Sequence, residues 1–140
     1  MTYHIATTTT LDFEHAIAET NAALARHGFG VLSDIDVSAT LAKKLGTSMP
    51  PYRILGACNP ALAQQALAAE PLIGTMLPCN VVVREDQDGG VQVAAVDPVA
   101  SMQAVDNSAL GGIAAKVRDL LETVVGEIGA AKPGPWKPGP

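Results

Sequence analysis

The sequence is poor in aromatic residues, in charged residues and in cysteine, and each shortage excludes a class of protein. Only 4% of the residues are aromatic, so Ala, Val, Leu and Ile must supply the apolar core. Charged residues amount to 16%, against roughly 25% in an average domain, and hydrophobic residues to 48%, which excludes extensive intrinsic disorder. Two cysteines are too few for a disulfide framework in a chain of 140 residues.

An excess of basic charge and long apolar runs are also lacking. The net charge is −5, opposite in sign to the surface of a nucleic-acid-binding protein. No stretch approaches the roughly 18 consecutive apolar residues of a membrane-spanning helix. The N-terminal MTYHIATTTT lacks the basic and apolar segments of a secretory signal. The sequence therefore predicts a cytoplasmic protein with reduced thiols and with neither a nucleic-acid nor a membrane partner.

The apolar residues that are present follow strand and helix periodicities along most of the chain. Strands are expected over 3–10, 29–37, 52–57, 81–85 and 91–96, with helices over 11–27, 38–45, 60–69 and 108–128 and shorter helical turns near 72–77 and 97–104. Thr10 or Asp12 is expected to cap the first helix, Ser38 the second and Asn59 the third.

This order of elements predicts an α+β fold. We expect a sheet of about five, mainly antiparallel strands with helices packed on one face. The length fits a single domain over residues 1–129, followed by a Pro/Gly-rich flexible tail over 130–140 that contains Trp136. Because a small sheet has exposed edges, the domain is expected to protect them by forming a homodimer.

Two Cys-Asn pairs lie at expected strand boundaries and form the main candidate site. Cys58 and Asn59 stand where a strand enters a helix, and Cys79 and Asn80 come just before the next strand. Free N–H groups and the positive end of a helix dipole stabilise a thiolate, so Cys58 is expected to have a lowered pKa. If the two strands are neighbours, the two sulfur atoms can approach each other. The alternative is that both cysteines are small buried core residues.

A metal site at these cysteines would need further ligands. Zinc takes about four protein ligands, or three with one open position. His4 is expected on the first strand and could face the cysteines, whereas His15 and His27 lack ligand spacing and are expected at the surface. The metal-ligand candidates are therefore Cys58, Cys79 and His4, and the sequence identifies no cofactor.

A few other polar residues are candidates for binding. Arg53, inside the third strand, could clamp an anion or form an ion pair with Asp34 or Asp36 on a neighbouring strand. The two aspartates could act as paired carboxylates, but a solvated strand face is the simpler interpretation. Tyr52 ends a Pro-rich apolar loop that could wall a pocket, and Asp97, before a proline, is most simply a turn former.

Several of these segments together resemble the bacterial and archaeal domain of unknown function 302 family. The resemblance covers roughly residues 1–128 and rests on GFGVL at 28–32, IDV at 35–37, PPYRILGACNP at 50–60, EPLIG at 70–74, LPCNVVV at 77–83 and VDP at 96–98. It implies an α+β domain similar to the TATA-binding-protein-like fold, usually a homodimer. Both cysteines of the family pattern are present as Cys58 and Cys79. The family's activity is not established, so the resemblance implies a fold and a site but no reaction.

Three functions are compatible with these residues. The first is a small-ligand or metal-containing-cofactor site in a cleft near the cysteines, with Cys58, Asn59, Cys79, Asn80, Arg53 and Tyr52 as ligand-binding candidates. The second is a thiol-based redox enzyme or sensor, with Cys58 as nucleophile and Cys79 as resolving thiol. The third is a dimeric interaction module that acts through its dimer surface and tail.

Overall fold

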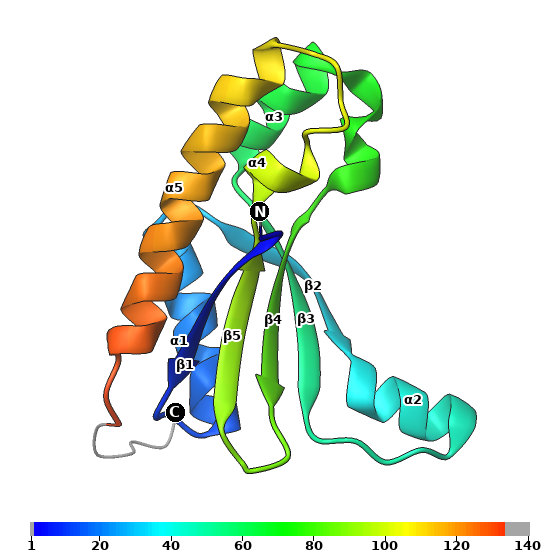
Figure 1. Cartoon of the computed structure of the whole chain (residues 1–140), viewed down its shortest axis with the longest axis vertical. Helices are drawn as coiled ribbons and strands as arrows, with labels where there is room; N and C mark the ends of the chain where they lie inside the picture. The colour runs from blue at the N-terminus through cyan, green and yellow to red at the C-terminus, as the bar shows by residue number, and fades with distance from the viewer. Residues whose placement is uncertain (1, 134–140) are drawn as a thin grey trace.

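A computed structural model describes residues 2–133 as an α+β domain. Its elements run along the chain as β1 (His4–Thr9), α1 (Phe13–Arg26), β2 (Gly30–Asp36), α2 (Val37–Leu45), β3 (Tyr52–Cys58), α3 (Pro60–Ala69), η1 (Pro71–Met76), β4 (Cys79–Glu85), β5 (Val91–Val96), α4 (Pro98–Ser101) and α5 (Ala109–Ala130) (Figure 1). The tail expected from residue 130 starts at the end of α5, and Trp136 lies outside the described residues.

The sheet has five strands in the order β1-β5-β4-β3-β2, and every neighbouring pair is antiparallel. The predicted α+β class and antiparallel sheet are therefore confirmed. The hairpin expected at DQDGG joins β4 to β5, and β1 pairs with β5 from His4 opposite Val96 to Thr9 opposite Val91. The two edges of the sheet are β1 and β2.

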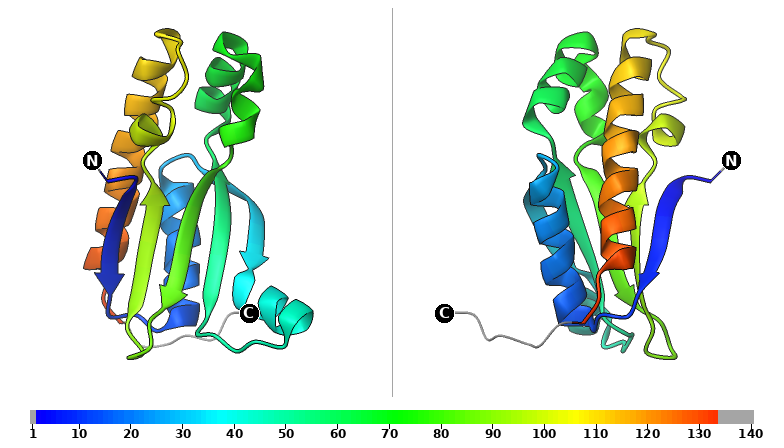
Figure 2. Two further views of the ribbon diagram at one scale, coloured as in Figure 1. Left: turned by 45° about the vertical axis from the view of Figure 1, so that its right-hand side comes forward. Right: turned by 90° about the vertical axis from the view of Figure 1, so that its left-hand side faces the viewer.

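Two helices, α1 and α5, cover one face of the sheet (Figure 2). Leu24 of α1 and Leu121 and Ile128 of α5 are fully buried against Val81 and Val93 of the sheet. Gly129 permits the close approach of α5 to β1, because a Cβ there would collide with the side chain of Thr7. The prediction of helices on one face holds for these two helices, whereas the others lie at the ends of the sheet.

Apart from α2, the helices that do not cover the sheet pack together with the N-terminal half of α5 and form a second unit beyond the end of the sheet. It consists of α3, η1, α4 and the N-terminal half of α5, and we call it the helical end unit (Figures 1 and 2). Ala66, Ile73 and Leu110 form its own small buried cluster, separate from the main core. The domain therefore has two apolar clusters, and the junction between them lies at the ends of β3 and β4.

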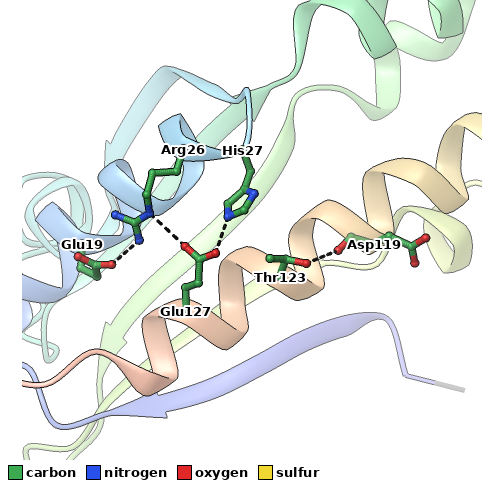
Figure 3. Close-up of polar contacts among 6 residues, drawn as sticks. All are labelled: Glu19, Arg26, His27, Asp119, Thr123 and Glu127. Carbon is green, nitrogen blue, oxygen red and sulfur yellow. Dashed lines mark hydrogen bonds and ion pairs between the residues drawn. The ribbon is translucent and has the colours of Figure 1, made fainter.

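A polar cluster joins the end of α1 to α5 (Figure 3). The Arg26 guanidinium contacts Glu19 at 2.7 Å and Glu127 at 3.0 Å, and His27 Nε2 lies 2.5 Å from Glu127 Oε2. The hydrogen bond from His27, reinforced by the one from Arg26, lowers the pKa of Glu127. The histidine that the sequence assigned to the surface therefore fixes the two covering helices to each other.

The helix α2 projects from the sheet beyond the end of β2 (Figure 1) and has no buried residue. Ser38 does not cap it as predicted, because Asp36 does so: the Asp36 carboxylate accepts hydrogen bonds from the Ala39 N–H and the Ser38 hydroxyl. These hydrogen bonds lower the pKa of Asp36. The helix ends at Gly46, whose φ of 68° is the left-handed conformation that favours glycine.

The other expected helix starts agree with the structure. Asp12 caps α1 through the His15 N–H, and Asn59 caps α3 through the Leu62 N–H with Pro60 in the first helical position. Gly28, with φ of 83°, follows the end of α1 as expected. Within the described residues, no helix is both long and apolar enough to cross a membrane.

Candidate functional site

Cys58 and Cys79 line one small pocket at the junction between the sheet and the helical end unit. Cys58 is the last residue of β3 and Cys79 the first of β4, and Cys79 lies opposite Ala57 in the strand register. Each cysteine is therefore brought to the pocket by the end of a strand. The sequence analysis required the two strands to be neighbours if the thiols were to approach each other, and β3 and β4 are neighbours.

The pocket has a volume of about 40 Å³ and lies between the two apolar clusters. Ala57 and Cys79 come from the main core, whereas Ala66 and Leu77 come from the helical end unit. Among the described side chains that line it, only that of Asn59 carries nitrogen or oxygen. A space of this size exceeds the roughly 10–15 Å³ that a water molecule needs, but so apolar a lining offers water few partners. The pocket therefore suits an apolar group.

Three sulfur-containing residues line the pocket, since Met102 joins Cys58 and Cys79. We call the space the sulfur pocket. Both cysteines are free, and Cys79 is 7% exposed whereas Cys58 is half-buried. Burial, and to a lesser degree the neighbouring Cys58, raises the pKa of Cys79 to about 11. Cys79 is therefore a neutral thiol near neutral pH.

The start of α3 leaves few free N–H groups for a thiolate at Cys58. Pro60 has no N–H, the Leu62 N–H donates to the Asn59 side chain, and the Ala63 N–H donates to the Asn59 carbonyl oxygen. The side chain and the carbonyl group of Asn59 are therefore both used to cap α3. The end of α1 also approaches it closely, because a Cβ on Gly28 would lie 3.3 Å from Asn59 Nδ2.

Two candidate site residues, Tyr52 and Asn80, lie on the opposite face of the sheet from the sulfur pocket. They line a second hollow of about 290 Å³ on the face that α1 and α5 leave uncovered, and His4 lines it too. Side chains alternate between the faces of a strand, so Asn80 points away from the face that Cys79 occupies. The four residues of the two Cys-Asn pairs therefore do not form one site, because Asn80 lies apart from the other three.

Arg53 belongs to neither hollow. Its guanidinium forms an ion pair with Asp34, in which Nε lies 3.0 Å from Asp34 Oδ1, and this hydrogen bond raises the pKa of Arg53. Of the two partners that the sequence offered, Asp34 is the one used, and Asp36 caps α2 instead. The aspartates are engaged separately and do not form a carboxylate pair.

A family model, domain of unknown function DUF302, matches residues 5–128. The chain belongs to the DUF302 family. The match includes both cysteines and every element from β1 to the last turns of α5, so the resemblance noted in the sequence is confirmed.

A solved relative has the same fold. The crystal structure of an uncharacterized conserved DUF302 protein from Bacillus stearothermophilus superposes with a TM-score of 0.85 at 27% identity, covering 91% of this chain and 99% of that chain. No curated protein matches the chain. The comparisons thus give this DUF302 domain a fold and a family but no reaction.

Metal-ligating side chains do not gather in the described part of this DUF302 domain. Residues 2–133 contain no group of three or more His, Cys, Asp or Glu side chains placed to hold one ion. His4 pairs edge-on with Tyr3, at 4.6 Å between ring centroids, and lines the other hollow. The structure therefore separates His4 from the two cysteines with which the sequence grouped it.

One wall of the sulfur pocket was missed by the sequence analysis. Pro98 lines it from α4, Met102 lines it directly after the end of that helix, and Ala114 lines it from α5. Asp97 positions this wall: its carboxylate accepts hydrogen bonds from the Val99 and Ala100 N–H groups and from Arg118 Nε at 3.0 Å. The Asp-Pro pair at 97–98, which repeats the Asn-Pro helix start at 59–60, was the available signal.

Burial would by itself raise the pKa of Asp97, which is 7% exposed. The hydrogen bonds from Arg118 and from the Ala100 and Val99 amides outweigh this effect and lower the pKa. Asp97 therefore remains a carboxylate and links α4 to α5 at the back of the pocket.

Proposed function

We propose that this DUF302 domain is a small-ligand-binding domain whose sulfur pocket takes an apolar group. The observation that carries the proposal is that both cysteines line one apolar pocket at the junction of two separately packed clusters. Such a junction can open by a small displacement of the helical end unit without disturbing the main core. An apolar occupant needs no hydrogen-bond partners from the wall, and the wall offers only Asn59.

The proposal is tested with xenon, which enters apolar protein cavities. Xenon is added under pressure to the isotope-labelled full chain, and amide chemical shifts are followed by NMR. The variants Ala114→Leu and Ala115→Leu form a matched pair, because Ala114 is buried at the pocket and its neighbour is exposed. We expect xenon to shift resonances around Ala63 and Ala114 in the natural protein and in Ala115→Leu, but not in Ala114→Leu.

Native mass spectrometry of freshly purified protein supplies a second readout. A bound species that is present in the natural protein and in Ala115→Leu, but lost in Ala114→Leu, supports a physiological ligand at this pocket. Xenon shifts that avoid the pocket, or that survive unchanged in Ala114→Leu, overturn the proposal.

A soft metal ion is a second candidate occupant, favoured by the third sulfur of Met102. Soft thiolate and thioether ligands suit Cu(I), and two thiolates with one thioether could hold it. Loading with Cu(I) against a chromophoric competitor tests this role. Met102→Leu should weaken retention, whereas Met76→Leu, at an exposed position outside the pocket, should not. Equal retention by both variants counts against the metal.

A thiol redox role has less support. A resolving cysteine attacks as a thiolate, and the raised pKa of Cys79 leaves little thiolate near neutral pH. We also propose a reducing, cytoplasmic location, because both cysteines are free thiols. Trapping thiols in intact cells with an alkylating agent tests this location: we expect both thiols to be alkylated, whereas a Cys58–Cys79 disulfide would contradict the reducing location and would support the redox role.

We further propose that two copies of the domain pair through β2 and α2. The edge strand β2 is exposed along most of its length, and Leu32, Ile35 and Leu45 of this segment are 71%, 50% and 70% exposed. A short helix gains most of its stability from packing, yet α2 has no buried residue in the single chain. A second copy would supply the missing packing and would cover the sheet edge.

Light scattering after size-exclusion chromatography tests this dimer. Leu32→Lys should produce a monomer, whereas Leu72→Lys, at a residue that is 77% exposed on the helical end unit, should leave the dimer intact. A natural protein that is monomeric at high concentration would exclude the dimer. The TATA-binding-protein-like topology stays a hypothesis, which a backbone superposition on one repeat of that fold would test.

A further inference from the structure

The face of the sheet opposite α1 and α5 carries a continuous apolar row. In the strand register, Ile35 lies opposite Ile54, Ile54 opposite Val82, Val82 opposite Ala94, and Ala94 opposite Ala6. The row therefore crosses all five strands. Figure 2 shows α1 and α5 on the other side of the sheet, so the described helices leave this open face uncovered.

Polar side chains border the apolar row on both sides. One row away, Tyr52 lies opposite Arg84 and Arg84 opposite Gln92. On the other side, Asn80 and His4 line the same hollow of about 290 Å³. Residues on one face of a strand recur about every 6.7 Å, so Arg84 and Asn80 are separated by about 13 Å along β4.

The open face has a charge unlike that of the whole molecule. The chain contains 14 acidic residues and has a net charge of −5, yet among residues 2–133 no Asp or Glu lines this hollow. Its fixed positive charge is Arg84, which is half-buried and donates from Nε to Gln92 Oε1 at 3.0 Å. This hydrogen bond orients the guanidinium, and within residues 2–133 no carboxylate pairs with it.

We propose that the open face binds a small organic carboxylate with a flat apolar body. The carboxylate accepts hydrogen bonds from the terminal nitrogens of Arg84, and the apolar body lies over Val82 and Ala94. A hydrogen-bonding group at the far end of the ligand reaches Asn80 or His4. Arginine suits this role because its planar donors match a carboxylate in a bidentate geometry.

A second copy of the chain is a poorer occupant of the same surface. In a symmetric face-to-face contact each surface meets its own copy, and the described residues that line the hollow include no carboxylate for Arg84. Burying an unpaired guanidinium is strongly unfavourable. A small carboxylate satisfies Arg84 while its apolar body covers Val82 and Ala94 at the centre of the row, and it leaves β2 and α2 free for the proposed dimer.

The test uses trans-4-hydroxycinnamate as the probe and its uncharged amide, 4-hydroxycinnamamide, as the matched control. Both are titrated into the isotope-labelled full chain while amide chemical shifts are followed by NMR. We expect saturable shifts at Val82, Arg84 and Ala94 with the carboxylate. The amide should bind at least about tenfold more weakly, because charge-assisted hydrogen bonds are stronger than neutral ones.

Two arginine variants separate a local contact from net charge. Arg84→Gln should weaken carboxylate binding about tenfold or more. Arg53→Gln changes the net charge equally, but Arg53 is bonded to Asp34 outside the hollow, so binding should be unchanged. Ala94→Leu keeps Arg84 but fills the apolar floor of the hollow, and it should also weaken carboxylate binding.

Several results would overturn the proposal. These are equal affinity for the carboxylate and the amide, equal affinity in the two arginine variants, or no saturable shift on β4 and β5. Chemical-shift changes confined to residues of the sulfur pocket would show that the probe binds there and not on the open face. Shifts on the open face that depend on protein concentration without the probe would show that a second copy occupies it.

Discussion

Pro78 packs so closely over Gly56 that a Cβ on this glycine would lie 2.7 Å from the proline Cγ. The side chain of Ser33, on the neighbouring strand, would collide with the same Cβ. Pro78 lines the sulfur pocket directly before Cys79. The absence of a side chain at Gly56 therefore lets the start of β4 lie against the end of β3, where it places Cys79 near Cys58.

Gly56→Ala is expected to destabilise the fold by about 1–3 kcal/mol, the usual cost of forcing extra volume into a packed site. Gly30→Ala is the matched control in β2, because nothing lies within 4 Å of a Cβ there. Urea unfolding of both variants measures the difference. If Gly56→Ala unfolds at the same urea concentration as Gly30→Ala, the contact with Pro78 is not a packing constraint.

Cys79 should make the free energy of unfolding depend on pH under alkaline conditions. Its pKa rises from 9.0 to about 11 on folding, so the unfolded chain loses the thiol proton first. The stabilisation is complete below the unfolded pKa and is lost as the pH rises toward the folded pKa. At about 1.4 kcal/mol per pKa unit, the loss amounts to about 2–3 kcal/mol.

The comparison is with Cys79→Ala, measured by chemical unfolding across the interval between the two pKa values. This variant should be less stable at neutral pH, because it loses packing, but its stability should fall less steeply with rising pH. Parallel pH profiles for the two proteins would show that Cys79 ionises equally easily in the folded and unfolded chains.

Asp97 should stabilise the fold above its unfolded pKa. Removing the cap of α4 by Asp97→Ala should cost about 1–2 kcal/mol near neutral pH. Because the folded pKa is lowered, this contribution should be lost as the pH falls below 3.8 and through the folded pKa. Asp106→Ala, at an exposed position near the start of α5, should have little effect. If Asp97→Ala lowers the free energy of unfolding by the same amount in acid as near neutral pH, the stabilisation does not depend on the charge of the carboxylate.

Thr20 is a site where a substitution should stabilise the protein. Its side chain is fully buried in α1, and its hydroxyl has no hydrogen-bond partner in the part of the chain that the structure describes. Thr20→Val replaces the hydroxyl with a methyl group and should add about 1 kcal/mol to the free energy of unfolding. Thr20→Ser keeps the hydroxyl, loses the methyl group and should cost about 1 kcal/mol. A less stable valine variant would reveal a hidden partner for the hydroxyl.

Local signals in the sequence located the elements well. The strand Val91–Val96 and the helix Pro60–Ala69 have the expected bounds, because alternation and the Asn-Pro helix start are encoded within a few residues. Ser38 was wrongly expected to cap α2, since the helix already begins at Val37 and Asp36 therefore occupies the capping position.

The composition of the candidate site was predicted only in part. The sequence analysis grouped Cys79 with Asn80 as an adjacent pair and placed Tyr52 and Arg53 among the ligand-binding candidates of the same cleft. Side chains in a strand alternate between its two faces, so adjacent residues such as Cys79 and Asn80 serve different surfaces.

The sequence by itself determined the α+β class, most helix and strand positions, and the two cysteines as residues at strand ends, because these depend on local propensity and capping. Tertiary structure alone decided that both thiols share one pocket, that residues of α4 and α5 help to complete its wall, and that a hollow lined by Arg84 and by no acidic residue among those described lies on the other face of the sheet. Those relationships join segments far apart in the chain. They arise from strand order and from the packing of α5 across both apolar clusters, which no local pattern encodes.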